Sequence, residues 1–319
     1  MPPSKPKPSE IAAEAKRTYI PYIRHNFSDT WPSTSYLCHS ESLIAPPSTT
    51  PNRQVHFAFY DEDPVDLAIK WTATEEHPIP VIVAANDKRP GGDWEAGKYL
   101  KCKSKLLNIR SNLVATLTTP AAGNSATSNY PIPSKAGIYS KTVVVFRNGP
   151  ERYEPWQEYQ AIPVISVCPV KRPKLDTSGK KYSFKQEKEL MRDKIRTALR
   201  IAIYNGHYNL CIGTFGLGPG FRNPPEEIAS MWRDAFLRDP EFQNHFEDVV
   251  FAFQNPEGPS AVGTPGSTTS KTSSKSSSSK SSSKSSSSKS SSSSKSTAAS
   301  DLEVFRQVFK PANIHGAFK

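Results

Sequence analysis

A glycine-rich segment, residues 213–224, carries the clearest chemical signal in the sequence. It reads GTFGLGPGFRNP, with four glycines in its first eight positions, between a predicted strand and a predicted helix. Glycine lets the backbone approach a ligand closely and adopt positive φ. We expect Asn223 to cap the following helix, with Pro224 at its start and Glu226 completing a capping box. The free N–H groups and positive dipole of this helix end would then face an anion such as a diphosphate.

The segment fits neither the P-loop pattern nor GxGxxG, so a tight turn without a ligand stays the alternative. If the segment binds a ligand, its glycines and the residues between them are the expected contacts. These are Gly213, Thr214, Phe215, Gly216, Leu217, Gly218, Gly220 and Phe221.

A second loop, residues 83–97, leaves a predicted central strand at its carboxyl end, where ligands bind in open α/β sheets. Asn86 offers a donor and an acceptor to a sugar hydroxyl, and Gly91 and Gly92 allow close backbone approach. A Pro-Gly-Gly turn alone is a weak signal, since it occurs in many loops. Together with the glycine-rich segment it predicts a cleft for a nucleotide sugar.

The elements that must position these loops alternate between strand and helix patterns, which predicts a layered α/β domain. The continuous apolar run 79–85 suits a central strand that is covered on both faces. Asp63 and Pro64 are typical of a helix start. Ser9 is a candidate cap for the first helix, and Gly206 is a candidate helix end. We expect strands at 55–59, 79–85, 142–146, 162–167, 210–212 and 249–253, and helices at 9–23, 64–69, 191–203, 224–236 and 302–309.

Two stretches have too little apolar surface to offset chain entropy and are predicted to be disordered. They are the proline-rich residues 1–8 and the Ser/Lys-rich residues 256–300. The remainder, residues 9–255 and 301–319, then forms a single domain with one insertion. The net charge is +11, from 41 Lys and Arg against 30 Asp and Glu, but six of the lysines and no acid lie in 259–300. The rest carries only +5, so bulk charge does not argue for nucleic-acid binding.

The Ser/Lys tract allows three interpretations. A low-complexity linker without a function of its own is the first. The second is modification, because its five Lys-Ser steps are the kind of site at which serine is ADP-ribosylated, and serine runs invite phosphorylation. A loose tether to nucleic acid, with an affinity that falls steeply with salt, is the third. Elsewhere, residues 170–174 (VKRPK) resemble a short nuclear-import signal.

Several classes of protein are excluded or disfavoured. No apolar run approaches the roughly 20 residues needed to span a bilayer, and the N-terminus lacks the apolar core of a signal peptide. The four cysteines lie far apart with no CxxC pair, which argues against a disulfide framework and a zinc site. His207 and His245 lack metal-ligand spacing. We therefore expect an intracellular protein, nuclear or cytoplasmic, with no metal, no cofactor and no membrane contact.

Further motifs follow one another along nearly the whole chain. They are the strand–Asp63–helix unit, AAN…PGG at 84–92, RSNL at 110–113, YPIP at 130–133, GIYS at 137–140 with VVVFR at 143–147, the strand 162–167, the glycine-rich segment, VVFAF at 249–253 and VFRQVF at 304–309. In this order they resemble the microbial-type poly(ADP-ribose) glycohydrolase (PARG) family, a branch of the macrodomain fold. The resemblance covers about 250 residues.

The resemblance implies a three-layer α/β fold with a mixed central sheet and helices on both faces. It implies ADP-ribose, poly(ADP-ribose) or ADP-ribosylated proteins as ligands, with Asn86 holding the distal ribose. Phe253 resembles the aromatic residue on which macrodomains stack adenine, and packing in the core is the alternative for it.

The sequence departs from the active family at the catalytic loop. That family has three glycines followed, several residues later, by Gln-Glu-Glu, whose glutamates serve catalysis. Here Asp93 replaces the third glycine, and the Gln-Glu-Glu positions hold Lys103, Ser104 and Lys105. The glycine-rich segment also looks one residue longer, at 219–220. No catalytic residue of the family is therefore retained, and Asp93 and Glu95 are the candidates for a substitute.

These departures bear directly on hydrolysis. Breaking a ribosyl bond passes through an oxocarbenium-like state that a carboxyl group assists. A lysine at that place opposes the developing positive charge by about 4 kcal/mol at ~4 Å and an effective dielectric constant near 20. That corresponds to roughly three orders of magnitude in rate. Binding need not suffer, because a lysine can pair with the phosphates of the ligand.

Three functional hypotheses follow. The first is a pseudoenzyme: a macrodomain that recognises ADP-ribose or its polymer and cleaves it weakly or not at all. The second is an active glycohydrolase with a rearranged acid. The third is a nucleic-acid-associated protein that acts through the basic Ser/Lys tract.

Overall fold

The computed structural model describes residues 7–44, 46–48, 50, 53–96, 106–123, 127–149, 153–253 and 300–312. The predicted Ser/Lys insertion apart from Ser300, and all but the last two residues of the predicted disordered N-terminus, lie outside these ranges, and so do Lys103, Ser104 and Lys105. Within them, no helix is both long and apolar enough to cross a membrane.

A seven-stranded mixed sheet forms the middle layer, in the order β1-β4-β5-β3-β6-β7-β2. The strands are β1 (Tyr36–His39), β2 (His56–Tyr60), β3 (Val81–Ala84), β4 (Ala136–Arg147), β5 (Pro155–Val167), β6 (Leu210–Ile212) and β7 (Asp248–Ala252). β4 pairs antiparallel with β1 and β5, whereas the remaining neighbours pair in parallel. The six predicted strands are confirmed, and the predicted 142–146 and 162–167 are the ends of longer strands. The short edge strand β1 was not predicted.

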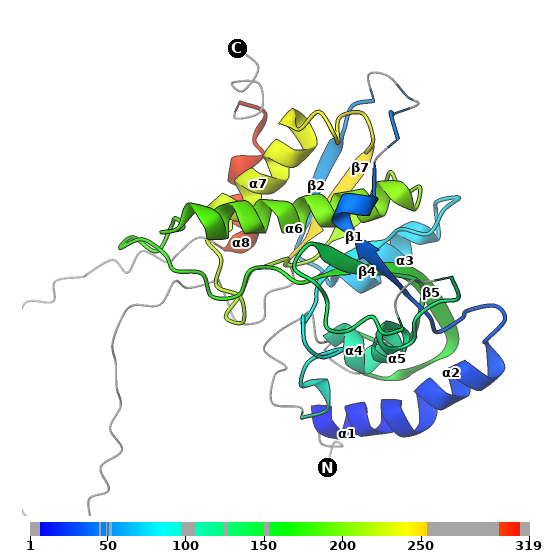
Figure 1. Cartoon of the computed structure of the whole chain (residues 1–319). Helices are drawn as coiled ribbons and strands as arrows, with labels where there is room; N and C mark the ends of the chain where they lie inside the picture. The colour runs from blue at the N-terminus through cyan, green and yellow to red at the C-terminus, as the bar shows by residue number, and fades with distance from the viewer. Residues whose placement is uncertain are drawn as a thin grey trace, which may run out of the picture.

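Helices cover both faces of this sheet (Figure 1), which confirms the predicted three-layer arrangement. One face carries α6 (Lys185–Tyr204), α7 (Pro225–Arg238) and α8 (Asp301–Val308). The other carries α3 (Pro64–Thr72), α4 (Leu106–Arg110) and α5 (Leu113–Thr118). Aromatic rings of α8 and of the residue that follows it pack on the parallel half of the sheet, with Phe305 5.2 Å from Phe251 and Phe309 4.8 Å from Phe57 between ring centroids. The segment after the Ser/Lys tract therefore belongs to the same core.

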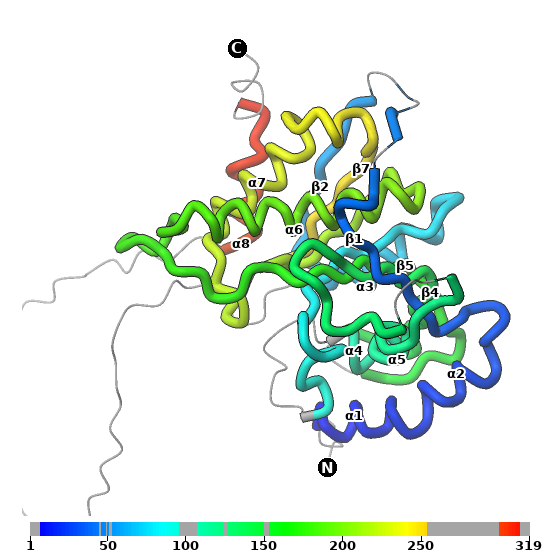
Figure 2. The backbone as a smooth tube through the Cα atoms, in the orientation of Figure 1, coloured from blue at the N-terminus to red at the C-terminus, as the bar shows by residue number. Residues whose placement is uncertain are grey.

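The N-terminal helix lies outside α4 and α5 (Figure 2) and packs on residues of α4, α5 and β4. The predicted helix 9–23 is correct in place but consists of α1 (Pro8–Glu14), the π-helical turn η1 (Ala15–Tyr19) and α2 (Ile20–Asn26). The π-helical turn precedes Pro21, which has no N–H to continue the α-helical ladder. Ser9 does not cap this helix, because α1 begins at Pro8 and its N-cap residue is Lys7. The Lys7 N–H donates to the Glu10 carboxylate.

Other predicted helix ends are confirmed. Asp63 caps α3, since its Oδ1 accepts from the N–H groups of Val65 and Asp66 at 2.9 and 3.1 Å. Gly206 follows α6 with φ +75°, and its N–H donates to the Ile203 carbonyl. Two 3-10 turns complete the fold, η2 (Ser40–Ser42) and η3 (Trp94–Ala96).

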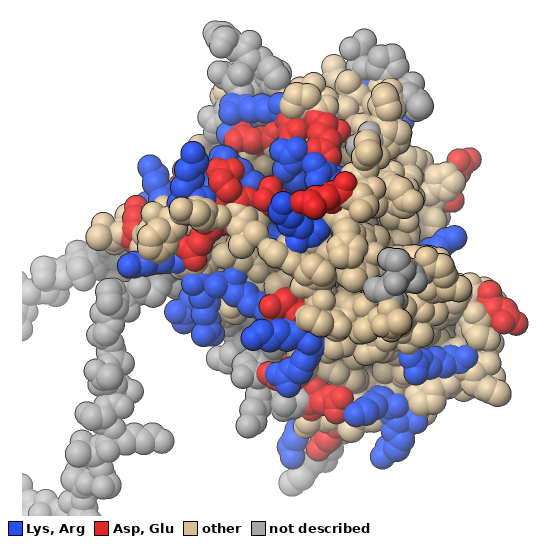
Figure 3. Space-filling view, in the orientation of Figure 1, with Lys and Arg blue, Asp and Glu red and all other residues tan. Residues whose placement is uncertain are grey.

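Charges of both signs alternate on the face that carries α6 and α7 (Figure 3). Arg196 pairs there with Asp239 at 3.0 Å and with Glu241 at 2.7 Å, and Arg200 also pairs with Glu241. This face is therefore not a surface of uniform positive charge.

Candidate functional site

A cavity of about 400 Å³ opens at the carboxyl ends of β3 and β5. Both predicted binding loops reach it. Asn86 and Gly91 line it from the loop after β3, and Gly220 and Phe221 line it from the glycine-rich segment. The two segments lie far apart in sequence, and the neighbouring parallel strands β3 and β6 bring their starts side by side.

The Asn86 side chain and two glycines set the course of the loop after β3. The Oδ1 atom of Asn86 accepts hydrogen bonds from the N–H groups of Lys88 and Arg89, both at 2.9 Å. Gly91 has φ +64°, and a Cβ atom there would lie 2.8 Å from Cγ2 of Val114. Gly91 is therefore required by both conformation and space. Gly92, with φ +60°, continues the turn beside Asn86.

The glycine-rich segment divides its predicted contacts among three places. Gly220 and Phe221 line the cavity, whereas Gly213 and Thr214 line a small adjoining pocket of about 30 Å³ that shares Val83 and Ala84 with it. The side chains of Phe215 and Leu217 are buried in the core under α7. Gly216 and Gly218 adopt φ +76° and +79° and form the turn between these places.

Asn223 joins the two segments that carry the cavity residues Lys171 and Gly220 rather than capping α7. Its Nδ2 donates to the carbonyl oxygens of Val170 and Gly216 at 2.8 and 2.7 Å, and its Oδ1 accepts from the Tyr182 hydroxyl at 2.8 Å. The N-cap of α7 is Pro224, with no side-chain hydrogen bond. The prediction of an Asn223 cap was therefore wrong, because its Oδ1, the atom that would accept from the helix N–H groups, accepts from the Tyr182 hydroxyl instead.

Two cations on the cavity wall come from the segment that resembled an import signal. Lys171 and Arg172 both line the cavity. The Arg172 N–H donates to the Phe221 carbonyl at 2.6 Å, which ties this segment to the glycine-rich one. Lys171 Nζ lies 2.6 Å from Oδ1 of Asp87. Burial raises the pKa of Asp87, but the hydrogen bond and charge of Lys171 outweigh it and leave that pKa below its ordinary value.

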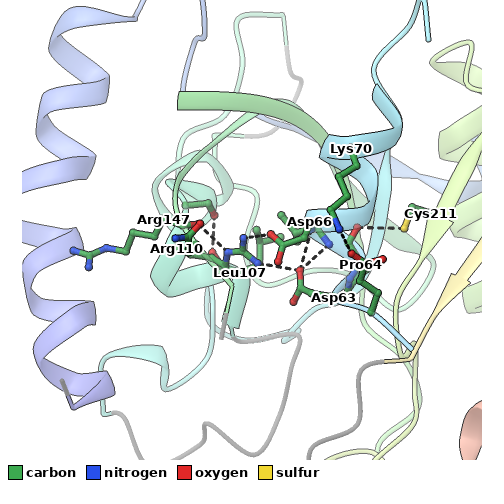
Figure 4. A network of polar contacts seen from close by, with 12 residues as sticks. Asp63, Pro64, Asp66, Lys70, Leu107, Arg110, Arg147 and Cys211 are labelled. Carbon is green, nitrogen blue, oxygen red and sulfur yellow. Dashed lines mark hydrogen bonds and ion pairs between the residues drawn. The ribbon is translucent and has the colours of Figure 1, made fainter. Parts of the chain in front are cut away.

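A buried charge network holds α3 against the end of α4 (Figure 4). The Arg110 side chain is fully buried; its guanidinium donates to Asp63 Oδ1 at 2.9 Å, to Asp66, and to the Arg147 carbonyl at 3.2 Å. Burial raises the pKa of Asp63, and the positive charge of Arg110 opposes that rise. The RSNL motif thus fixes α4 and α5, which carry the cavity residues Asn108, Leu113 and Leu117.

The two candidate acids differ in position. Asp93 lines the cavity, and its carboxylate pairs with Arg89 at 2.5 Å. Glu95 pairs with Lys16 of η1 at 3.1 Å, and both side chains are exposed. Of the described residues that line the cavity, Asp93 is the one that carries a carboxylate.

Phe253 is buried at the end of β7. Its ring centroid lies 4.7 Å from that of Phe305 and 6.4 Å from that of Phe251. This position agrees with the core-packing alternative, and adenine stacking on this ring stays a prediction.

His207 contacts a side chain of the core. The ring of His207 lies 2.9 Å from the Tyr139 hydroxyl, and burial lowers the pKa of His207 to about 4. Among the residues that the structure describes, no group of three or more His, Cys, Asp or Glu side chains could hold a metal ion.

Sequence reasoning missed the cavity residues Asn108, Tyr130, Ser166, Lys171 and Arg172 as site residues. One of them had a visible signal: Ser166 is the polar residue within the apolar strand 162–167. The other four lie in a helix and in loops, and the sequence alone does not show that these segments meet at the cavity.

Comparison with known proteins shows which family part of this chain resembles and which fold it shares. The family model of the microbial-type PARG catalytic domain matches residues 12–148, which include the loop after β3 and the RSNL motif. Among curated proteins, no sequence matches this chain.

Two solved structures represent the structural matches. PARG from Thermomonospora curvata, bound to the inhibitor ADP-HPD, has a TM-score of 0.60 and 18% identity, over 78% of this chain and 94% of that one. PARG from Deinococcus radiodurans in complex with ADP-ribose has a TM-score of 0.55 and 20% identity, over 74% and 91% of the two chains. Motifs and fold therefore agree that this chain resembles the microbial-type PARG family, with residues 12–148 matching its catalytic domain and the described chain sharing the macrodomain-like fold of the bacterial enzymes.

Proposed function

We propose that this protein binds ADP-ribose, free or at the end of poly(ADP-ribose) on a modified protein, in the cavity at the ends of β3 and β5. One observation carries the proposal: the two loops that the sequence singled out for a nucleotide sugar line the same cavity. Its volume of about 400 Å³ lies in the usual range for a small-molecule site. The ADP-ribose bound by the Deinococcus radiodurans PARG supports this ligand.

The charges on the cavity wall suit a diphosphate. Lys171 and Arg172 are exposed cations on it, and the backbone of Gly220 and Phe221 is close by. Cations and backbone N–H groups are the usual partners of phosphate oxygens. We therefore assign the diphosphate to the side of the cavity between these two segments.

We further propose that the protein is a reader with little or no hydrolytic activity. Ribosyl hydrolysis needs a carboxyl group placed at the scissile bond. The Gln-Glu-Glu positions hold Lys103, Ser104 and Lys105 in the sequence. Asp93 is held by Arg89, and Glu95 is held by Lys16. In this proposal, residues 9–255 and 301–319 form a single binding domain, with the Ser/Lys tract 256–300 as an insertion between them.

Binding is tested by calorimetric titration of the full chain with ADP-ribose. We expect heat of binding for the wild type and an affinity weaker by about tenfold to a hundredfold for Lys171→Glu with Arg172→Glu, because two charges next to the diphosphate change sign. The double variant Lys180→Glu with Lys181→Glu is the matched control, since these two exposed lysines lie further along the same connection between β5 and α6 but do not line the cavity. Absence of binding by the wild type contradicts the proposal, and equal weakening in both double variants contradicts the assignment of the diphosphate.

Hydrolysis is tested by incubating the protein with poly(ADP-ribose) and separating the products. We expect no release of ADP-ribose above the buffer control. The alternative of an active glycohydrolase draws support from Asp93, whose carboxylate is on the cavity wall. Release that Asp93→Asn or Glu95→Gln abolishes would establish that alternative and remove the reader hypothesis.

A further inference from the structure

Two hydroxyl groups at the cavity have no hydrogen-bond partner among the described residues. They are Oγ of Ser166 and Oη of Tyr130, and both residues line the cavity. Ser166 is only 1% exposed. Buried hydroxyls are nearly always paired, because an unpaired one loses its hydration without compensation. An unpaired hydroxyl on a residue that lines a cavity is therefore a candidate partner for a ligand.

The alternation of β5 shows that the Ser166 side chain faces the cavity side of the sheet. Its neighbours Ile165 and Val167 pack with α6 on the opposite face. The residues paired with Ser166 across the sheet are Val83 and Ile138, and both pack in the core beneath α4 and α5. Side chains directly opposite one another in a sheet share a face. Ser166 thus lies on the face where Val83, Leu113 and Leu117 line the cavity.

Tyr130 contributes in a similar way. Its ring packs at the edge of the same core, and its hydroxyl is buried at the cavity. Burial also raises the pKa of Tyr130, so the hydroxyl keeps its proton and can donate. Asn108 also lines the cavity, and its Nδ2 lies 3.4 Å from the Gly91 carbonyl oxygen.

We propose that Ser166 and Tyr130 form a hydroxyl-binding wall that recognises the terminal ribose of ADP-ribose. This inference rests on the proposed function. Neutral hydroxyls donate and accept at once, as sugar hydroxyls do, whereas the diphosphate is better served by Lys171 and Arg172. Position agrees as well, because Val83, the partner of Ser166, lies three residues before Asn86, where the predicted ribose-binding loop begins.

The test compares Ser166→Ala and Tyr130→Phe with the control Ser140→Ala. Ser140 lies on β4 and is equally buried, and its Oγ likewise has no partner in the described part of the chain, but it does not line the cavity. ADP-ribose and ADP, which lacks the terminal ribose, are titrated into each full-length variant. We expect Ser166→Ala and Tyr130→Phe to weaken ADP-ribose binding by about threefold to tenfold each, and to leave ADP binding unchanged.

Thermal unfolding without ligand supplies an independent readout. Removing an unpaired buried hydroxyl should leave the melting temperature unchanged or raise it, for Ser166→Ala and Ser140→Ala alike. A loss of affinity without a loss of stability separates recognition from a folding defect. The inference is overturned if wild-type protein binds ADP-ribose and Ser166→Ala and Tyr130→Phe bind it equally well, or if they lose ADP affinity to the same extent. Wild-type protein that binds no ADP-ribose refutes the proposed function itself.

Discussion

Replacing Arg110 with leucine is expected to lower the free energy of unfolding by about 3–5 kcal/mol, because it leaves Asp63 buried and Asp66 partly buried without their cation. Arg110 is fully buried and bonds to both carboxylates and to the Arg147 carbonyl. Urea denaturation of the wild type and of Arg110→Leu measures the effect. Lys70→Ala is the control, since the Lys70–Glu62 pair is exposed on its lysine side and should contribute less than about 1 kcal/mol.

The loss in Arg110→Leu should also depend on pH. Without the guanidinium, the pKa of Asp63 in the folded protein rises further above the unfolded value of about 3.9. A group whose folded pKa is raised stabilises the protein at low pH, and that stabilisation is lost as the pH rises through the folded pKa. The difference between wild type and variant should therefore be smaller at pH 5 than at pH 7. A difference that is independent of pH, or below 1 kcal/mol, would contradict the role of this network.

Replacing Asn223 with alanine should cost about 2–4 kcal/mol of stability and weaken ADP-ribose binding by about tenfold or more. The side chain makes three hydrogen bonds, and its loss leaves the Val170 and Gly216 carbonyls buried without that donor. Val170 precedes the cavity residue Lys171, and Gly216 lies in the segment that carries the cavity residue Gly220, so both segments should loosen. About 1.4 kcal/mol of lost preorganisation is enough for a tenfold change in affinity.

Asn26→Ala is the matched control for this variant. Asn26 is exposed at the end of α2 and bonds through Nδ2 to the Tyr22 carbonyl. We expect its loss to change stability by no more than about 0.5–1 kcal/mol and to leave binding unaffected. Calorimetric titration at a temperature where circular dichroism shows both variants to be folded separates affinity from stability. Wild-type affinity in a destabilised Asn223→Ala variant would show that the Asn223 hydrogen bonds support the fold without shaping the cavity.

The sequence predicted much of the fold because its signals are local. Apolar alternation and apolar runs located the six strands of the sheet other than β1, and Asp63 and Gly206 marked helix boundaries correctly. The loops of Asn86 and Gly220 were also identified by local chemistry, and both line the cavity. Edge strand β1 was missed because its four residues are too few for a periodic pattern.

Competition between local and distant partners explains the predictions that failed. Asn223 had the residue type of a helix cap, but its Oδ1 accepts from the distant Tyr182 hydroxyl, and α7 begins one residue later, after Pro224. Ser9 had the type of a cap as well, but α1 already begins at Pro8. A propensity ranks residue types at a position and carries no information about the groups that the fold brings there.

The amino-acid order alone indicated which segments form glycine-rich loops and which run through the core as strands, and it placed Lys103, Ser104 and Lys105 where the resemblance puts Gln-Glu-Glu. Only the tertiary structure decided that Lys171, Arg172, Tyr130 and Ser166 meet at one cavity, and that Glu95 pairs with Lys16. The physical reason is the order of the strands: β5, β3 and β6 are neighbours in the sheet although long segments separate them in the chain. Their carboxyl ends therefore gather side chains that no local pattern connects.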